Sequence, residues 1–229
     1  MQRVFDILLS GIAILCFLPI LLALMLVLRF SGESEVFYRQ IRVGRNGRLF
    51  GLLKFATMLK NSSNMGAGEI TLRNDPRILP VGHFLRKTKL NELPQLLNVF
   101  VGDMSLVGPR PMVPNTFANY PADTKDIIGS VRPGLSGIGS IAFRDEERYL
   151  DRLVDPQAFY RSEIIHYKAE LECWFVNNQS LLLYFQVIFV TAWVVLLPKS
   201  QIANMIFKDL PRAPESCYLN NARKPFGNP

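Results

Sequence analysis

The side chains best suited to chemistry gather in one stretch of 26 residues, 86–111, with the sequence RKTKLNELPQLLNVFVGDMSLVGPRP. Asn91 can act as a helix N-cap, because its side-chain oxygen can accept hydrogen bonds from the next free backbone amides. Glu92 falls in the first turn, where the helix dipole favours a carboxylate. Apolar side chains then recur at roughly helical spacing, at Leu93, Leu96, Leu97 and Phe100. The pattern predicts an amphipathic helix that begins at Asn91.

Basic side chains flank this predicted helix start. Arg86, Lys87 and Lys89 precede it, and Arg110 follows it between two prolines. Helix N-termini and guanidinium groups both bind phosphate, so the stretch is a candidate phosphate site. The residues alone leave open an ordinary capped helix with solvated bases, because caps and basic turns are common.

A β-hairpin is predicted just upstream, at 36–50, with the sequence VFYRQIRVGRNGRLF. Val36, Tyr38 and residues 41–43 favour strands, and Gly-Arg-Asn-Gly at 44–47 supplies turn chemistry. Downstream, the glycine-rich loop 131–140 is a weak phosphate cradle on its own. The charged run 143–148 is typical of a solvated helix start.

Two helices are predicted towards the C-terminus. One runs from Asp155 to about Trp174. The other covers 181–197, which has 17 residues, one Gln and no charge. That length is short for a membrane span, so this helix suits either the core or an in-plane interfacial position with Tyr184 and Trp193 at headgroup depth.

The N-terminal run 7–28 has 22 uncharged residues, which is about 33 Å of helix and enough to cross a bilayer core. Pro19 removes a backbone donor near its middle, so a break or kink is expected. Basic side chains stand on both sides, at Arg3 and Arg29. A single kinked span and a helix that enters and leaves on the same face both fit.

The composition combines a net charge of +7 with 49% hydrophobic residues. Residues 36–90 hold eleven Lys and Arg against two acids, a local charge of +9. A basic and apolar chain suits a partner that is anionic and apolar, namely a membrane surface, and we expect no nucleic-acid partner. Three scattered cysteines and two separated histidines offer neither a disulfide framework nor a metal-ligand cluster.

The order of these segments strongly resembles the bacterial sugar transferases, the monotopic phosphoglycosyl transferases of polyprenyl-phosphate glycan assembly. The segments that carry the resemblance are VFYRQIRVGRNGRLF, NDPRI, ELPQLLNV, GDMSLVGPRP and VRPGLSGIGS, of which ELPQLLNV and GDMSLVGPRP are the most specific, and it covers roughly residues 1–200. It implies transfer of a sugar-1-phosphate from a UDP-sugar to polyprenyl (undecaprenyl) phosphate, with release of UMP and with Mg²⁺ as the cofactor. A homodimer stays open.

The resemblance also implies a fold and a location. We expect a mostly helical α+β protein with a re-entrant membrane helix in 1–35, broken at Pro19. A small catalytic domain with a hairpin and interfacial amphipathic helices should follow in 36–200, and a tail in 201–229. This arrangement places the catalytic domain on the cytoplasmic face of the bacterial inner membrane, with membrane lipid as a partner.

Site residues follow from matching positions of the family's motifs. Asn91 and Glu92 occupy the catalytic Asp-Glu pair, and Glu92 is the expected metal ligand. The expected substrate phosphate contacts are Arg86, Arg110 and Lys54. The nucleotide and sugar end is expected at Arg132, Asp145 and Glu146.

Asn91 is the most informative departure from the family's pattern, which has an Asp nucleophile at this position. A carboxamide is neutral and a far weaker nucleophile than a carboxylate, so a covalent two-step mechanism does not carry over directly. Three explanations stay open: direct attack by polyprenyl phosphate, an engineered Asp-to-Asn change, or a silent homologue that binds nucleotide-sugar or lipid. Leu18 and Ala56 also replace the family's usual Ser and Arg.

Overall fold

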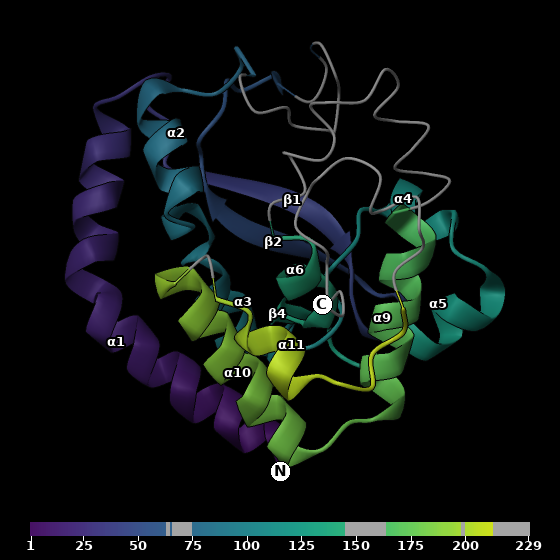
Figure 1. The fold of residues 1–229 in the computed structure, drawn as a ribbon. Helices are drawn as coiled ribbons and strands as arrows, with labels where there is room; N and C mark the ends of the chain where they lie inside the picture. The colour runs from purple at the N-terminus through teal and green to yellow at the C-terminus, as the bar shows by residue number, and fades with distance from the viewer. Residues whose placement is uncertain (63–64, 66–74, 145–163, 198–199, 213–229) are drawn as a thin grey trace.

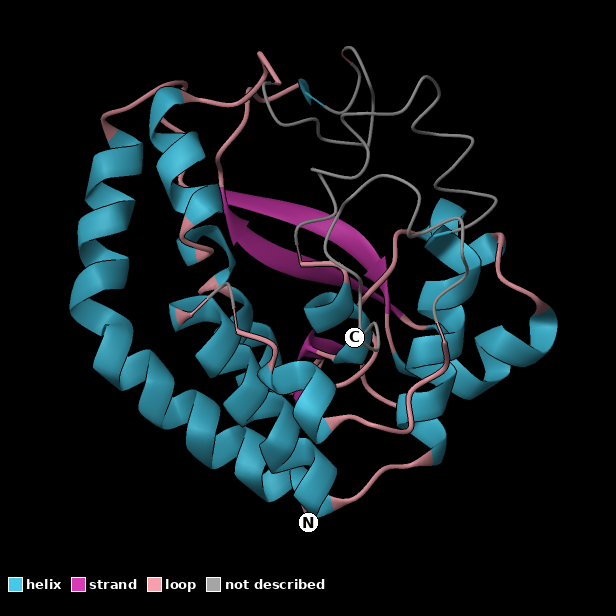
Figure 2. Ribbon diagram, in the orientation of Figure 1, coloured by secondary structure: helices cyan, strands magenta, loops and turns pink. Residues whose placement is uncertain are grey.

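The computed structural model describes residues 1–62, 65, 75–144, 164–197 and 200–212. Within these ranges the chain is mostly helical, with two small strand pairs (Figure 2). The mostly helical α+β class is confirmed at this level. Asp145, Glu146 and the helix start predicted at Asp155 lie outside the described residues.

Helix α1 (Gln2–Arg29) is continuous over 28 residues and contains Pro19, so the predicted break at this proline is absent from the helix. Figure 1 shows it along one side of the molecule, with a bend along its length, as expected where a proline interrupts the backbone ladder. Near its start, Arg3 Nη1 donates to Val99 O at 2.6 Å. Near its end, Leu28 is fully buried with Phe55 and Leu85. Both ends of α1 therefore pack against the same body.

The outward face of α1 is apolar and exposed. Among the described residues, α1 is the one helix that is long and apolar enough to cross a membrane, by length and composition only. Its exposed apolar side chains include Leu8, Ile12, Leu15, Leu18, Leu22 and Leu26. Such a continuous apolar surface marks a membrane or protein contact rather than a face turned to water.

The predicted hairpin is confirmed. Strands β1 (Phe37–Val43) and β2 (Leu49–Phe55) pair antiparallel around the turn η1 (Arg45–Gly47). Asn46 and Gly47 both take positive φ, 56° and 73°, which is the conformation that Asn and Gly adopt most easily. Strand β2 continues through the apolar stretch around Lys54, which faces Tyr38 in the register.

Shorter elements connect the hairpin to the C-terminal helices. They are α2 (Pro80–Lys87), η3 (Leu90–Glu92), α3 (Gln95–Val101), β3 (Ser105–Val107), α4 (Pro114–Ala118), α5 (Ala122–Gly129), β4 (Gly134–Ser136) and α6 (Ile138–Ala142). Strands β3 and β4 pair in parallel, with Ser105 opposite Gly134 and Val107 opposite Ser136. This pairing brings the residues before the Pro-Arg-Pro motif against the glycine-rich loop.

The main core lies where α9 (Ile165–Asn177) and α10 (Leu181–Leu196) pack on β3, β4 and α6. Tyr167, Leu171, Val187 and Val190 are fully buried there. Full burial of an aliphatic side chain is worth about 1.5–3 kcal/mol, so this cluster holds the C-terminal helices in place. Helix α11 (Ile202–Ile206) covers the same core with Ala203.

The sequence left open whether residues 181–197 form a core helix or an interfacial helix, and helix α10 has one face suited to each. One face is buried, at Leu183, Tyr184, Val187, Val190 and Val194. The other is exposed and apolar, at Leu182, Phe185, Phe189, Trp193 and Leu196. The prediction that Tyr184 lies at headgroup depth is wrong: its side chain is 2% exposed, and its hydroxyl donates to Asp6 Oδ1 at 2.9 Å.

Candidate active site

The helix predicted to begin at Asn91 begins four residues later, at Gln95, and Asn91 lies in the short turn η3. The amides of Glu92 and Leu93 are already bonded to the carbonyls of Lys89 and Leu90, at 3.0 and 3.2 Å. Pro94 has no amide hydrogen at all. No nearby amide is left for the Asn91 side chain to cap, so the N-cap prediction is wrong for a local reason.

Asn91 is nevertheless buried, with 6% of its surface exposed. Within the described part of the chain, its side-chain oxygen Oδ1 has no hydrogen-bond partner. Lys89, just before it, takes a left-handed φ of 61°, which is unfavourable for a residue with a Cβ. A buried orphan oxygen beside a strained backbone is costly, and such features concentrate at functional sites.

The turn η3 opens into a large cavity of about 1670 Å³. Its described walls carry five lysines and six arginines against two glutamates: Lys54, Lys60, Lys87, Lys89, Lys168, Arg39, Arg42, Arg77, Arg86, Arg110 and Arg144, with Glu35 and Glu92. A concave surface with this charge attracts polyanions, because low-dielectric walls focus the field. Phosphate-bearing ligands fit it best.

The cavity brings together five of the predicted site residues, which are Lys54, Arg86, Asn91, Glu92 and Arg110. Arg132 is not among its described lining residues, and Arg132 Nε donates instead to Gly102 O at 2.9 Å. The nucleotide and sugar role of Arg132, Asp145 and Glu146 stays a prediction.

Lys54 and Glu92 influence each other's protonation across the cavity. Burial lowers the pKa of Lys54 to about 7; the Glu92 carboxylate partly opposes this, while Arg42, Arg110 and Arg86 add to the lowering. Burial alone would raise the pKa of Glu92, yet nearby cations, Lys54 first, hold it below its usual value. At neutral pH the site therefore offers an ionised carboxylate beside an amine close to its own titration point.

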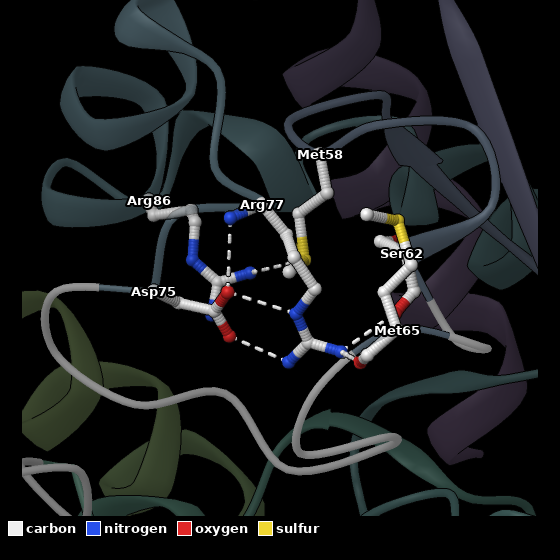
Figure 3. A network of polar contacts seen from close by, with 6 residues as sticks. All are labelled: Met58, Ser62, Met65, Asp75, Arg77 and Arg86. Carbon is white, nitrogen blue, oxygen red and sulfur yellow. Dashed lines mark hydrogen bonds and ion pairs between the residues drawn. The ribbon is translucent and has the colours of Figure 1, made fainter.

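Arg86 reaches the cavity from the end of α2, next to a buried ion pair (Figure 3). Arg77 is 4% exposed; its Nε and Nη2 donate to the Asp75 carboxylate at 2.8 and 2.5 Å, and its Nη1 donates to Ser62 O at 2.6 Å. Arg86 Nη1 lies 3.8 Å from Met58 Sδ, a weak acceptor. The pair fixes the chain around residues 58–62, against which the Arg86 guanidinium lies.

Three neighbouring elements hold the backbone around Arg110. Gly134 N of β4 donates to Pro109 O at 2.8 Å, and Arg42 Nη1 of β1 donates to Pro111 O at 3.0 Å. The Arg110 amide donates to Glu172 Oε1 of α9 at 3.2 Å. Sequence reasoning identified Arg110 and missed these supporting contacts, because nothing in the spacing of Arg42 or Glu172 points to the backbone of residues 110–111.

An apolar wall adjoins the charged part of the cavity. Ala13 and Phe17 come from α1, Leu96 comes from α3, and Ile188 and Val195 come from α10. Helices α1 and α10 touch near their starts, where the Phe5 and Phe185 rings meet edge to face at 5.1 Å. The cavity thus offers phosphate-binding groups and a surface for hydrocarbon side by side.

The described residues contain no group of three or more His, Cys, Asp or Glu that could enclose a metal ion. Mg²⁺ does not need such a cage, because it keeps waters and takes one or two carboxylates together with substrate phosphates. Glu92 supplies an ionised carboxylate, and Asn91 Oδ1 next to it supplies an unused oxygen. These two oxygen donors fit a magnesium ion that arrives with a diphosphate.

Comparison with known proteins gives a family match over most of the chain. Residues 1–198 match the model of the bacterial sugar transferase family. The undecaprenyl-phosphate galactose phosphotransferase of Salmonella typhimurium is 34% identical over 210 residues, which is 86% of this chain and 40% of that protein. The exopolysaccharide production protein ExoY of Rhizobium meliloti is 40% identical over 166 residues, which is 66% of this chain and 73% of that protein.

A third relative is the UDP-glucose:undecaprenyl-phosphate glucose-1-phosphate transferase of Escherichia coli. It is 33% identical over 178 residues, which is 76% of this chain and 37% of that protein. The chain therefore spans about two fifths of the length of the Salmonella and Escherichia proteins. The match to the family model, over residues 1–198, includes all the described residues that line the cavity.

Proposed function

The chain belongs to the bacterial sugar transferase family, and from this membership we propose that it transfers a sugar-1-phosphate from a UDP-sugar to undecaprenyl phosphate. The products are undecaprenyl-diphospho-sugar and UMP. The observation that carries the proposal is a cavity in which eleven cationic side chains of the described residues adjoin an apolar wall. Both substrates are polyanions and one of them is a lipid, so both parts of that cavity have a use.

The donor diphosphate binds among Lys54, Arg86 and Arg110 in this proposal. Two arginines offer planar donor pairs that match phosphate oxygens, and Lys54 adds a point charge that is already partly desolvated. The cluster lowers the barrier by stabilising the charge that moves onto the UMP phosphate as the bond to it breaks.

Magnesium, when bound, would neutralise diphosphate charge and align the phosphorus for attack. Glu92 and Asn91 are the residues that would hold it, because the Glu92 carboxylate is ionised and Asn91 Oδ1 has no hydrogen-bond partner among the described residues. Glu92 also keeps Lys54 partly protonated, because the carboxylate raises the pKa that burial lowers.

Asn91 determines the route of transfer. Because an amide oxygen is a poor nucleophile, we propose a single step in which an oxygen of undecaprenyl phosphate attacks the phosphorus that bears the sugar. That oxygen forms the new P–O bond, the bond between the two phosphates of the donor breaks, and UMP leaves with the electron pair. Asn91 and Glu92 position the donor without forming a covalent intermediate.

The acceptor lipid enters along the apolar wall between α1 and α10 in this proposal. Its phosphate then meets the cations while its chain lies against Phe17, Leu96 and Ile188. The exposed apolar faces of α1 and α10 would sit in the same bilayer leaflet from which the lipid comes.

We further propose that α1 is re-entrant rather than spanning, with the catalytic body on the cytoplasmic face. The support is that Arg3 and Leu28, near opposite ends of α1, both contact that body. In the test, a cysteine added before Met1 and a Ser31→Cys variant, each in a background without native cysteines, are labelled from one side of sealed vesicles. Both should label from the same side, and labelling from opposite sides would establish a span.

UMP release tests the function directly. Purified protein with Mg²⁺, undecaprenyl phosphate and either UDP-glucose or UDP-galactose should release UMP. A direct transfer releases none when the lipid is left out, whereas a covalent route releases one equivalent per protein. Appearance of that single equivalent would refute the one-step route and leave the overall reaction intact.

Asn91 itself favours a second candidate function, a silent homologue that binds nucleotide-sugar or lipid as an assembly partner. The two readings separate cleanly in the Asn91→Asp variant. If the native chain binds UDP-glucose and undecaprenyl phosphate but releases no UMP, and Asn91→Asp releases it, the silent homologue is correct. Release by the native chain establishes the transferase.

A further inference from the structure

Glu172 is a buried carboxyl that lies behind the cavity wall rather than in it. It belongs to α9, 2% of its surface is exposed, and its Oε1 accepts from the Arg110 amide at 3.2 Å. Burial of a carboxyl among apolar neighbours is unfavourable unless it makes compensating contacts. The carboxyl therefore needs an explanation that packing does not provide.

The glycine-rich loop leaves space for this carboxyl. A Cβ added at Gly139 would lie 2.5 Å from Glu172 Oε1, and one added at Gly137 would lie 2.3 Å from Gly108 O and 3.6 Å from Glu172 Oε2. Any larger residue at 139 would displace the carboxyl. Two segments that reach the cavity, the Pro-Arg-Pro loop with Arg110 and the start of α6 with Gly139, thus meet on Glu172.

One oxygen of this carboxyl is left over. Among the described residues, Glu172 Oε2 has no hydrogen-bond partner. Burial raises the pKa of Glu172 to about 7, against the opposing effects of the Arg110 amide and of the Lys168 and Arg110 charges. Lys168 lies one turn earlier on α9. Of the helices packed on α9, α6 brings no titratable side chain, and α5 carries Asp123, Lys125 and Asp126.

We propose that Glu172 is a positioning residue that fixes the Arg110 backbone, and through it the guanidinium in the cavity, by joining the Pro-Arg-Pro loop to the glycine-rich loop. The proposal rests on the proposed function only for what Arg110 binds. The contact itself concerns one backbone amide and one carboxyl, and both can be followed without any turnover.

The test exploits the two prolines. Pro109 and Pro111 have no amide hydrogen, so Arg110 gives the one exchangeable backbone amide across residues 109–111. Glu172→Met keeps the size and removes the acceptor, while Glu172→Gln keeps an acceptor and cannot ionise. Glu170→Met, on the exposed side of the same helix, is the matched control.

In Glu172→Met we expect exchange at the Arg110 amide to accelerate about tenfold or more and the Kd for UDP to rise about tenfold, because the loop is no longer held. Glu172→Gln and Glu170→Met should stay within about threefold of the native protein in both. An unchanged Arg110 exchange rate in Glu172→Met would overturn the proposal, whatever its melting temperature does.

A second measurement covers the case in which Glu172→Met does not fold. The ionised carboxylate is the stronger acceptor, so native Arg110 exchange, corrected for its intrinsic rate, should slow as pH rises from 6 to 8. Glu172→Gln should remove that dependence, and its persistence in the Gln variant would overturn the proposal. If exchange behaves as expected but the native protein binds no UDP, the proposed function fails and the positioning role stands.

Discussion

Two polar regions of this protein treat their buried groups in opposite ways. At the start of α1, the Asp6 carboxylate is 2% exposed, and its Oδ1 accepts from Ser105 Oγ, Leu106 N and Tyr184 OH at 2.9 to 3.0 Å. In the cavity, Asn91 Oδ1 is equally enclosed and, in the described part of the chain, accepts from nothing. Lys54 there lies among other cations.

This difference distinguishes a structural contact from a ligand site: we call the Asp6 cluster the anchor and the cavity around Asn91 the site. A buried acceptor with three donors stabilises one arrangement of the chain, here α1 against β3 and α10. A buried acceptor with no donor, beside desolvated cations, lowers the stability of the empty protein. A bound ligand that supplies the missing partner would offset this loss of stability. Substitutions in the two regions should therefore move stability and activity in different proportions.

The largest expected effect is on stability, at the anchor. Asp6→Ala leaves the three donors around Oδ1 without their acceptor, so we expect the free energy of unfolding to fall by about 3 kcal/mol or more. Urea unfolding in detergent measures it. Asp123→Ala, at an exposed position of α5, is the control and should change it by less than about 0.5 kcal/mol.

Activity per folded molecule should survive in Asp6→Ala, since Asp6 lies outside the cavity lining. If the fall in turnover, expressed as a rise in the activation free energy, equalled the fall in the free energy of unfolding, the distinction between anchor and site would be wrong.

Next in size is the loss of activity in Glu92→Gln. The amide keeps the shape and removes the charge that we propose holds magnesium, so UMP release should fall at least about 100-fold, or about 2.7 kcal/mol of barrier. The melting temperature should fall only modestly, because the cations that hold the Glu92 pKa low lose their counter-charge. Glu35→Gln changes the other glutamate of the cavity wall, which pairs with Lys60 at the surface, and should leave turnover within about twofold. Equal loss in both variants would contradict a specific role for Glu92.

Substitution of Lys54 should have a smaller effect: it should weaken donor binding without lowering the free energy of unfolding. Lys54→Met removes a desolvated cation from a cationic cluster, so the free energy of unfolding should stay level or rise by about 1 kcal/mol. Binding of UDP-glucose should weaken about tenfold, because one charge-assisted contact to the diphosphate is lost. Calorimetric titration measures the Kd, and Lys125→Met on α5 is the matched control. A lower free energy of unfolding together with an unchanged Kd would give Lys54 a structural role, like that of Asp6, instead of a role in binding.

The two regions also differ in how far the sequence predicted them. The hairpin could be predicted, because Gly-Arg-Asn-Gly at 44–47 acts locally and its backbone takes the expected positive φ at Asn46. Lys54, Arg86 and Arg110, which the resemblance implies as phosphate contacts, do line one cavity, while their role stays a prediction. The N-cap at Asn91 could not be predicted correctly, because Pro94 and the backbone bonds of η3 leave no amide for it.

Long-range partners were beyond the sequence. Asp6 meets Tyr184 across 178 positions, and Glu172 meets the Arg110 amide across 62. Neither pair has a spacing or a periodicity that would predict it, since tertiary packing alone brings them together. Tyr184 was accordingly predicted at the membrane interface, although its hydroxyl is the buried donor to Asp6.

The smallest effect, and the finest probe of the difference between the two regions, is the pH dependence of donor binding. The pKa of Lys54 is lowered to about 7, and a diphosphate favours the protonated amine, so Lys54 contributes to binding below pH 7 and loses that contribution as pH rises through it. UDP-glucose carries no group of its own that titrates near pH 7. Its Kd should rise about fivefold to tenfold between pH 6.5 and 8.

Lys54→Met should flatten this profile, whereas Asp6→Asn should leave it unchanged. Of the described residues that bond the Asp6 carboxylate, Leu106 alone lines the cavity, and it does so while donating through its backbone amide. Calorimetry in two buffers of different ionisation enthalpy provides an independent check. Donor binding at pH 7.5 should take up a proton in the native protein and none in Lys54→Met. Uptake that persists in Lys54→Met would assign the titration to another group of the cavity and would remove Lys54 from the contrast between site and anchor.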